Sequence, residues 1–356
     1  MPRKNQDNRS AERLEKFRQI LQRKAAMLIV TQDHPDPDAI GAAVALRKVV
    51  NTLAKVPCSI AHGGTVGRAE NRALVRYLGL NLRPCRELDF SKFDLIAMVD
   101  TQPGTGNNPL PEDYAPDIVF DHHPARKASR EVPFADIRPR YGATVTILLE
   151  YLRAAGITPD PPLATAMLYA IRSDTQDLGR EACQADVDAM AYLLGLANWR
   201  MLSGIQRGSL PRTYFLLLDE GLKNACFYGP ALVTTLGEVD NPDMIAEIAD
   251  LLLREDETTW TMCMGIFEGT LRISLRTRQE GARADRIIRR IVARRGTGGG
   301  HALYAGGQIP LADRPKTKRA RLMDTLRARF LKAIGQDARS AQKLLAPRPD
   351  KMDGPS

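Results

Sequence analysis

The segment MLIVTQDHPDPDAIGAAVALRKVV, residues 27–50, decides the fold. Its apolar start, 27–31, predicts a buried strand, and 38–53 carries the apolar pattern of a helix. Between them Pro35 and Pro37 alternate with acids and hold the chain extended, which projects the side chains at alternate positions 32 to 38 to one side. The structural alternative is a turn in which Asp38 caps the following helix.

Strands and helices continue to alternate beyond this segment, which predicts an α/β fold with a parallel sheet covered by helices on both faces. The further strands are expected at 57–62, 93–100 and 115–121, and the further helices at 143–155, 162–171 and 184–196.

After about residue 200 the pattern changes to that of a smaller α+β domain. We expect two hairpins, 225–236 and 259–277, a helix at 242–253, an arginine-rich helix and a glycine-rich loop at 296–307.

A chain of 356 residues is long enough for two domains. We predict that the first spans residues 11–200 and the second 223–335, with a helical linker at 201–222. The polar ends, 1–10 and 336–356, have the composition of disordered tails.

Composition limits the environment and the partners. The net charge of +9 and the pI of about 9.4 favour an anionic partner, although part of this charge lies in the tails. The five scattered cysteines, without a CxxC pair, fit neither a disulfide framework nor a zinc ribbon and favour a reducing cytoplasm. No apolar stretch is long enough to span a membrane, and residues 1–16 lack the apolar core of a secretory signal.

Acidic residues and histidines follow the predicted strands where a parallel sheet opens its ligand-binding edge. Asp100 ends one strand, Asp121, His122 and His123 end the next, and Asp174 follows an apolar helix. One such Asp is usually a cap or a turn residue, but several beside histidines indicate a metal site. Imidazole with carboxylates suits Mn²⁺ or a related ion such as Mg²⁺ or Co²⁺, and the carboxylates suffice for two ions that share a bridging Asp.

The glycine-rich segment 296–307 can bring backbone N–H groups close to an anion, because glycine has no Cβ and allows positive φ. His301 adds a directed donor, and Arg276 on the preceding strand can engage a phosphate through two parallel hydrogen bonds.

Taken together in their order along the chain, these motifs resemble a known family. Asp36-Pro37-Asp38-Ala39, Asp100, Asp121-His122-His123 and Asp174-Thr175 resemble the four motifs of the DHH phosphoesterase superfamily. The motifs Gly298-Gly299-Gly300-His301 and Ala305-Gly306-Gly307 resemble its DHHA1 domain. The resemblance is nearest to the nanoRNase/pAp-phosphatase (bifunctional oligoribonuclease) branch, with the exonuclease RecJ more distant.

The resemblance implies two Mn²⁺ ions and a role for each acidic motif. Asp36 would bind the first ion and Asp38 the second, with Asp100 bridging them. His122 and Asp174 would complete the second site.

It also implies the substrate contacts. His123 would face the substrate phosphate. Asp121 would orient the neighbouring histidines through hydrogen bonds without binding a metal itself. Substrate would lie in a cleft between the domains and contact the second domain through Arg276, Gly299, Gly300 and His301.

One position departs from the family pattern. Gln32 stands where the family usually has a metal-binding histidine. Three outcomes are open: the first site binds metal weakly, His34 replaces the missing ligand, or Gln32 reaches the metal through water.

The function implied is hydrolysis of short oligoribonucleotides or of 3′,5′-bisphosphate nucleotides such as pAp, by a cytoplasmic enzyme without membrane contact that forms a homodimer. Cleavage of cyclic or linear dinucleotides is a second hydrolase hypothesis. From another class comes a catalytically impaired nucleotide-binding regulatory protein, for which Gln32 is the main support.

Overall fold

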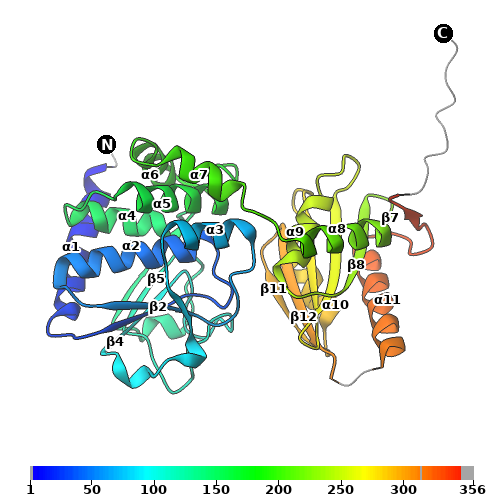
Figure 1. The fold of residues 1–356 in the computed structure, drawn as a ribbon, viewed down its shortest axis with the longest axis horizontal. Helices are drawn as coiled ribbons and strands as arrows, with labels where there is room; N and C mark the ends of the chain where they lie inside the picture. Colours follow the sequence, from blue (N-terminus) through cyan, green and yellow to red (C-terminus); the bar gives the residue numbers. More distant parts are fainter. Residues whose placement is uncertain (1–2, 313–314, 346–356) are drawn as a thin grey trace, which may run out of the picture. The chain divides into compact units, whose positions relative to one another are not determined.

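The computed structural model describes residues 3–312 and 315–345, and the chain divides into two compact units, Met1–Ser209 and Leu210–Ser356 (Figure 1). Each unit is described by itself. The predicted linker, 201–222, contains the end of one helix, Trp199–Gln206, and most of another, Arg212–Asn224, and the division between the units falls in the stretch between them. The predicted domain limits and the predicted cleft stay predictions.

The first unit contains a six-stranded sheet in which every pairing is parallel, in the order β3-β2-β1-β4-β5-β6. This confirms the predicted parallel sheet. Its strands are β1 Met27–Val30, β2 Cys58–His62, β3 Leu82–Pro84, β4 Leu95–Val99, β5 Ile118–Asp121 and β6 Phe134–Ile137. Its helices are α1 Arg3–Leu21, α2 Pro37–Ala54, α3 Ala69–Tyr77, α4 Thr144–Ala154, α5 Pro161–Asp174, α6 Gln184–Leu194 and α7 Trp199–Gln206, with short 3₁₀ helices η1 Cys85–Glu87, η2 Phe90–Lys92 and η3 Ala128–Arg130.

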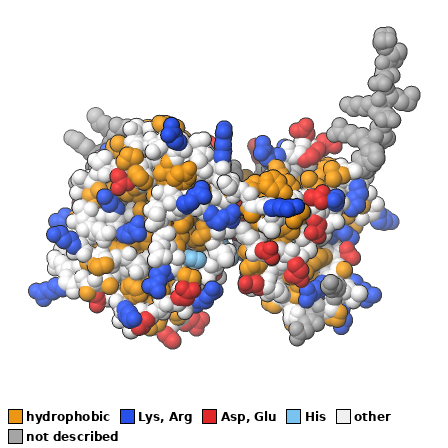
Figure 2. Space-filling model, in the orientation of Figure 1, with side chains coloured by type: hydrophobic (Ala, Val, Ile, Leu, Met, Phe, Trp, Pro, Cys, Tyr) orange, Lys and Arg blue, Asp and Glu red, His pale blue; other side chains and the backbone are white. Residues whose placement is uncertain are grey.

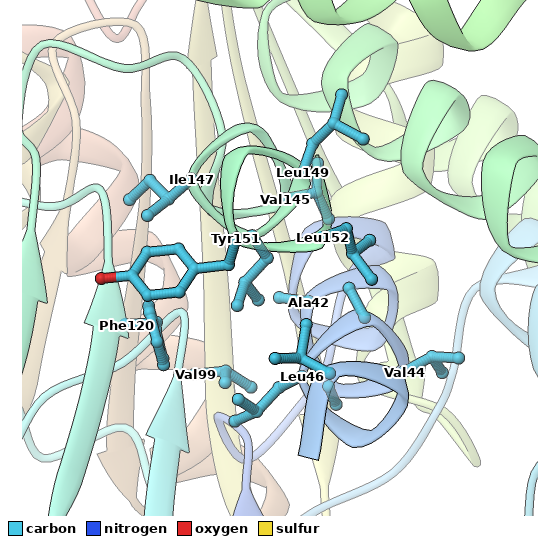
Figure 3. Packing of buried hydrophobic residues seen from close by; sticks show 14 of the residues in the cluster. Ala42, Val44, Leu46, Val99, Phe120, Val145, Ile147, Leu149, Tyr151 and Leu152 are labelled. Carbon is cyan, nitrogen blue, oxygen red and sulfur yellow. The ribbon is translucent and has the colours of Figure 1, made fainter. Parts of the chain in front are cut away.

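Both faces of this sheet are covered, as the unbroken burial of β1 requires. Ile29 belongs to the large core that the sheet forms with α1, α2, α4 and α5, whereas Leu28 and Val30 pack on the other face with Cys85 of η1 and Phe90 of η2. Figure 3 shows α4 resting on α2 and on the strands, with the fully buried ring of Tyr151 among the aliphatic side chains. Successive residues of a strand point to opposite faces, so a four-residue apolar strand serves two cores.

The N-terminal segment corrects one prediction, because residues 3–10 are the start of α1 rather than a disordered tail. Ser10 is 1% exposed, and its hydroxyl donates to Glu150 Oε2 at 2.6 Å and accepts from Arg138 Nη2 at 3.0 Å. Farther along the helix, Phe17 packs edge-on against Phe120 with ring centroids 5.7 Å apart. These contacts with distant residues order a segment whose composition alone is that of a solvated tail.

The second unit contains a seven-stranded mixed sheet in the order β11-β12-β10-β9-β8-β7-β13, in which β8 and β9 pair in parallel and the other pairs are antiparallel. Its strands are β7 Cys226–Tyr228, β8 Ala231–Glu238, β9 Trp260–Phe267, β10 Thr270–Thr277, β11 Thr297–Gly300, β12 Tyr304–Pro310 and β13 Gln342–Lys343. Its helices are α8 Arg212–Asn224, α9 Asp243–Leu252, α10 Ala284–Val292 and α11 Lys316–Ala333. Both predicted hairpins are present. β13 lies within the predicted tail 336–356, whose last residues, 346–356, are outside the described part of the chain.

The predicted glycine-rich loop, 296–307, is largely two paired strands, β11 and β12, joined through residues 301–303, which corrects that prediction. The glycines are there because a helix packs on one face of the pair. A Cβ at Gly307 would lie 2.9 Å from Ile288 of α10, and a Cβ at Gly298 would lie 3.3 Å from it. A Cβ at Gly299 would meet nothing within 4 Å. The glycines therefore admit α10 on one side and leave bare backbone on the other.

Positive charge is spread over each unit rather than gathered in one patch on the face seen in Figure 2, where lysine and arginine side chains are interspersed with acidic and hydrophobic ones. In α10 the buried residues include Ile288 and Ile291, whereas Arg289 and Arg290 are exposed. Within the described residues, every helix is too short or too polar to cross a membrane.

Candidate metal centre

The carboxyl ends of the neighbouring strands β1, β4 and β5 bring three predicted motifs to one edge of the first sheet. The turn after β1 is held by Asp36, which caps α2 by accepting a hydrogen bond from Ala39 N at 3.0 Å. The cap is therefore Asp36 and not Asp38, the alternative that the sequence suggested. Pro37, in the first turn of the helix, suits a position whose N–H has no partner within the helix.

Asp38 is fully buried and is bound by another helix. Its Oδ2 accepts from Thr144 N at 2.6 Å and its Oδ1 from Val145 N at 2.9 Å, at the start of α4. Ala143, at the N-cap position of α4, has no side-chain cap to offer, so Asp38 supplies one from a distant part of the chain. The partial positive charge at the helix start favours the carboxylate there.

Asp100 directly follows β4 in a left-handed backbone conformation, φ +57°, and is 1% exposed. Such a conformation costs a non-glycine residue on the order of 1–3 kcal/mol and persists where the surroundings enforce it. Its Oδ1 accepts from Thr144 Oγ1 at 3.1 Å and its Oδ2 from Gln32 Nε2 at 3.2 Å. These two contacts fix both oxygens of the carboxylate that is predicted to bridge the ions.

One ring nitrogen of His122 is hydrogen-bonded to the backbone, and the other makes no hydrogen bond among the described residues. Its Nδ1 lies 3.0 Å from Tyr141 O, and because a carbonyl oxygen can only accept, Nδ1 carries the proton. Its Nε2 lies 3.3 Å from Asp174 Oδ2 and 3.6 Å from Asp100 Oδ1, yet it is buried with no hydrogen-bond partner among the described residues. An imidazole oriented through Nδ1 by a backbone carbonyl presents Nε2 as metal-ligating histidines do.

The carboxylates of the cluster are too close together to be ionised at no cost. Burial and then the charge of Asp174 raise the pKa of Asp36 from 3.8 to about 6 and that of Asp38 to about 7. Burial and the neighbouring acids raise the pKa of Asp100 well above its ordinary value. Burial opposes protonation of His122, but Asp174 and Asp38 outweigh it and raise its pKa to about 10. The site therefore attracts positive charge, as protons or as a cation.

Two sets of ligand atoms lie close enough to hold ions: Asp38, His122 and Asp174, and Asp100, His122 and His123, with the atoms of each set within 4.8 Å of one another. Carboxylates and imidazole without thiolates are the donor set of Mn²⁺ and related ions. Nε2 of His122, which has no hydrogen-bond partner in the part of the chain that the structure describes, is the atom that a cation would satisfy. The residues therefore fit a divalent metal.

His123 differs from His122 in the hydrogen-bond partner of Nδ1, which is a carboxylate and not a backbone carbonyl. Its Nδ1 lies 2.8 Å from Asp121 Oδ1, which also accepts from the backbone N of His123 at 3.1 Å. Burial would raise the pKa of Asp121, but the hydrogen bond and charge of His123 outweigh it and hold the pKa below its ordinary value. Asp121 is thus ionised and His123 Nδ1 donates to it, so a metal or a substrate phosphate would meet His123 through Nε2.

The two candidates for the missing ligand have different neighbours in the structure. Gln32 contacts Asp100, whereas His34 Nδ1 lies 3.3 Å from Thr65 O in the loop after β2. His34 is in neither of the ligand groups found among the described residues.

In the second unit the predicted contacts gather around Tyr304. Its ring stacks on His301 with centroids 4.6 Å apart, and the guanidinium of Arg276 lies 5.8 Å from its centroid. Arg276 Nε also donates to Asp250 Oδ1 at 2.5 Å, a partner that the sequence did not reveal. Gly300 has φ +138°, and a Cβ at the half-buried Gly299 would meet open space.

Two further residues of β10 share the sheet face of Arg276, because side chains at i and i+2 point the same way. Arg272 Nε and Ser274 Oγ are buried and without a hydrogen-bond partner among the described residues. Ser274 was not among the residues predicted from the sequence. The alternation along Arg272, Ser274 and Arg276 was the signal that could have found it.

Sequence reasoning also gave no role in the metal centre to Thr144, Tyr141 and Gln102, which hold the acidic and histidine side chains in place. Thr144 binds Asp38 and Asp100, and Tyr141 O orients His122. Their side-chain types are common in turns and helix starts, so only their tertiary contacts mark them.

Two family models match the chain: the DHH family, N-terminal domain, over residues 26–171, and the DHHA1 domain over residues 229–332. An uncharacterized protein of Methanocaldococcus jannaschii is 32% identical over 321 residues, 88% of this chain and 65% of its own length. A probable manganese-dependent inorganic pyrophosphatase of Deinococcus radiodurans is 30% identical over 167 residues, 46% of this chain and 52% of its own. The chain thus spans less than two thirds of either curated relative.

Solved structures share the fold. An exopolyphosphatase-related protein from Bacteroides fragilis superimposes with a TM-score of 0.68 at 14% identity, covering 90% of this chain and 97% of that one. RecJ in complex with Mn²⁺ from Thermus thermophilus gives a TM-score of 0.50 at 14% identity, covering 92% of this chain and 55% of RecJ. With both domains matched in order, the chain belongs to the DHH/DHHA1 phosphoesterase family, as its motifs predicted.

Proposed function

We propose that the protein is a divalent-metal-dependent hydrolase that cleaves phosphoester bonds in short oligoribonucleotides or in 3′,5′-bisphosphate nucleotides such as pAp. The observation that carries the proposal is the buried Nε2 of His122, which makes no hydrogen bond among the described residues and lies among carboxylates whose pKa values are raised by burial and by their proximity. The manganese-dependent relative and the RecJ–Mn²⁺ complex support Mn²⁺ as the metal.

Each acidic side chain then has a place. Asp36 would hold the first ion, Asp38, His122 and Asp174 the second, and Asp100 both. Such ions polarise a phosphoryl group and activate water for in-line attack. Asp38 and Asp100 are already fixed by α4, which reduces the rearrangement that binding requires.

His123 would contact the scissile phosphate. Because Nδ1 donates to ionised Asp121, that contact is made through Nε2, where a proton can stabilise the charge that develops on a phosphoryl oxygen.

The second unit would bind the rest of the substrate. Arg276 and His301, grouped at Tyr304, and the bare backbone of Gly299 and Gly300 can recognise a second phosphate or a base. The buried polar atoms of Arg272 and Ser274 add donors on the face of Arg276. A nucleotide would offer these residues a base or a second phosphate separated by a sugar from the scissile one, which pyrophosphate lacks, and this supports pAp and short oligonucleotides as substrates.

The test is hydrolysis by the full chain of dinucleotide RNA, pentanucleotide RNA, pAp, a cyclic dinucleotide and pyrophosphate, each with Mn²⁺, with Mg²⁺ and with chelator. Asp100→Asn, which keeps the side-chain volume, is the inactive control. We expect Mn²⁺-dependent turnover of short RNA or pAp that Asp100→Asn abolishes. Preference for the cyclic dinucleotide would replace the substrate assignment, and preference for pyrophosphate would contradict it.

A second candidate function rests on the contact between Gln32 and Asp100, which places an amide where the family usually has a metal-binding histidine. In that case the protein binds nucleotide without turning it over. Nucleotide binding by calorimetry, without product from any substrate of the panel, would favour this regulatory function and overturn the hydrolase.

A further inference from the structure

Gln102 is a fully buried side chain whose amide is engaged at both ends. It follows Asp100 by two residues, beyond the end of β4. Its Nε2 donates to Asp121 Oδ2 at 2.6 Å and, over longer distances, to His123 O at 3.4 Å and Pro124 O at 3.3 Å. Its Oε1 accepts from Arg126 N and from Ser129 Oγ, each at 2.8 Å. A buried amide so completely paired is costly to replace, because each lost bond leaves a buried donor or acceptor unsatisfied.

The N–H group of this amide gives the second oxygen of the Asp121 carboxylate its hydrogen bond. One carboxylate oxygen accepts from the backbone N and from Nδ1 of His123, and the other accepts from Gln102. The carboxylate is therefore held at both oxygens and cannot rotate without losing a bond. Its orientation in turn sets the plane of the His123 ring.

A competing partner for His123 lies close by. His123 Nδ1 lies 2.8 Å from Asp121 Oδ1. Asp100 Oδ1 is 3.7 Å from the same nitrogen, just beyond hydrogen-bond distance. If Asp121 turned away, a small movement of the ring would bring Nδ1 to Asp100 and into the carboxylate cluster. The bond from Gln102 opposes this by keeping Asp121 in place.

We propose that Gln102 is a positioning residue for catalysis: it holds Asp121, and through it His123, so that His123 meets the substrate phosphate through Nε2 instead of turning toward Asp100. The role of His123 rests on the proposed function. The effect of Gln102 on the His123 ring does not, since both are described in the structure without substrate.

The decisive variant is Gln102→Glu. It keeps the shape and the oxygen that accepts from Arg126 N and Ser129 Oγ, but it puts a second oxygen against Asp121 in place of the donor. Ser129→Ala is the matched control, because it removes one bond from the same amide at the end away from Asp121. Gln102→Met, which loses both ends, serves as a second variant if the glutamate disturbs folding.

The first readout is the NMR resonance of the His123 Nδ1 proton in the full chain with diamagnetic Mg²⁺, assigned by its absence in His123→Ala. We expect this downfield resonance in the wild type and in Ser129→Ala, and its loss or large upfield shift in Gln102→Glu and Gln102→Met. Its persistence in the folded Gln102 variants would overturn the proposal.

The second readout is steady-state hydrolysis of the preferred substrate. We expect Gln102→Glu to lower kcat by about 10- to 100-fold with little change in KM, as loss of an orienting partner does, while Ser129→Ala stays near wild type. In the His123→Ala background the same substitution should cost little further, because residues that act through one another are not additive. An equal loss of kcat in both backgrounds would show a merely structural role.

The two measurements separate the two proposals. A wild-type protein that hydrolyses no substrate contradicts the proposed function, while the NMR resonance still decides whether Gln102 positions His123.

Discussion

The side-chain amide of Gln32 donates a hydrogen bond to Asp100 Oδ2 at 3.2 Å, so the residue that departs from the family pattern touches the carboxylate that is predicted to bridge the two ions. The amide occupies the position of a ligand and supplies a donor there. The predicted first metal site is therefore the one that we expect this departure from the family pattern to affect.

Gln32→His should strengthen that site, because neutral imidazole is a better ligand for Mn²⁺ than an amide. We expect Mn²⁺ affinity, measured by calorimetric titration of the metal-free protein, to rise by at least the roughly tenfold that a single partner is worth in a metal site. His34→Ala is the control and should leave affinity unchanged, since His34 lies against Thr65. A comparable loss of affinity in His34→Ala would instead identify His34 as the ligand.

Metal binding should compete with protons. The folded-state pKa values of Asp36 and Asp38, about 6 and about 7, lie above their ordinary 3.8, so the metal-free folded protein binds more protons than the unfolded chain in this window. Its stability from these groups is therefore present at low pH and falls as pH rises from about 4 to about 7. A divalent ion replaces those protons at neutral pH.

The corresponding measurement is Tm with and without Mn²⁺ between about pH 5 and about pH 8. The rise in Tm on adding Mn²⁺ should grow as pH increases through this range. A rise that is independent of pH would show that the metal binds away from Asp36 and Asp38.

The buried ion pair of Arg138 and Asp136 should be the most sensitive polar contact of the first unit. Arg138 Nη2 lies 2.8 Å from Asp136 Oδ2, and the two side chains are 7% and 1% exposed. Asp136→Asn removes one of the two carboxylates that bind the buried guanidinium, since Glu150 Oε2 remains 2.6 Å from Nη1, so we expect a loss of roughly 1–3 kcal/mol in the free energy of unfolding. Glu15→Gln, which affects an exposed ion pair with Arg18 in α1, should leave denaturant unfolding unchanged. Equal effects would contradict this ranking.

Gly307 in β12 and Gly299 in β11 offer a matched test of packing and binding, because an added Cβ would contact a helix at the first position and open space at the second. A Cβ at Gly307 meets Ile288 and Val292 at 2.9 and 3.0 Å, so Gly307→Ala should destabilise the second unit by roughly 1–3 kcal/mol through overpacking. A Cβ at Gly299 meets open space, so Gly299→Ala should leave the thermal transition almost unchanged. If Gly299 backs the substrate, its alanine variant should instead raise KM. An unchanged KM would remove Gly299 from the substrate contacts.

The parallel sheet and the composition of the candidate metal centre could be predicted from the sequence for one physical reason. Parallel strands present their carboxyl ends at the same edge, so Asp36, Asp38, Asp100 and His122 could be placed together without knowledge of any contact. The order of the motifs carried the family. The glycine-rich segment was misread as a loop, because glycine that admits a packed helix and glycine that forms a turn look alike in sequence.

What holds these residues was decided only by the tertiary structure. The sequence by itself determined which groups can bind a metal, since ligand chemistry belongs to the side chain. It did not determine that Asp38 caps α4, that Gln102 holds Asp121, or that Ser10 anchors α1. Each of these bonds joins residues far apart in the chain through common polar side chains, and such pairings follow from how the elements pack rather than from any local pattern.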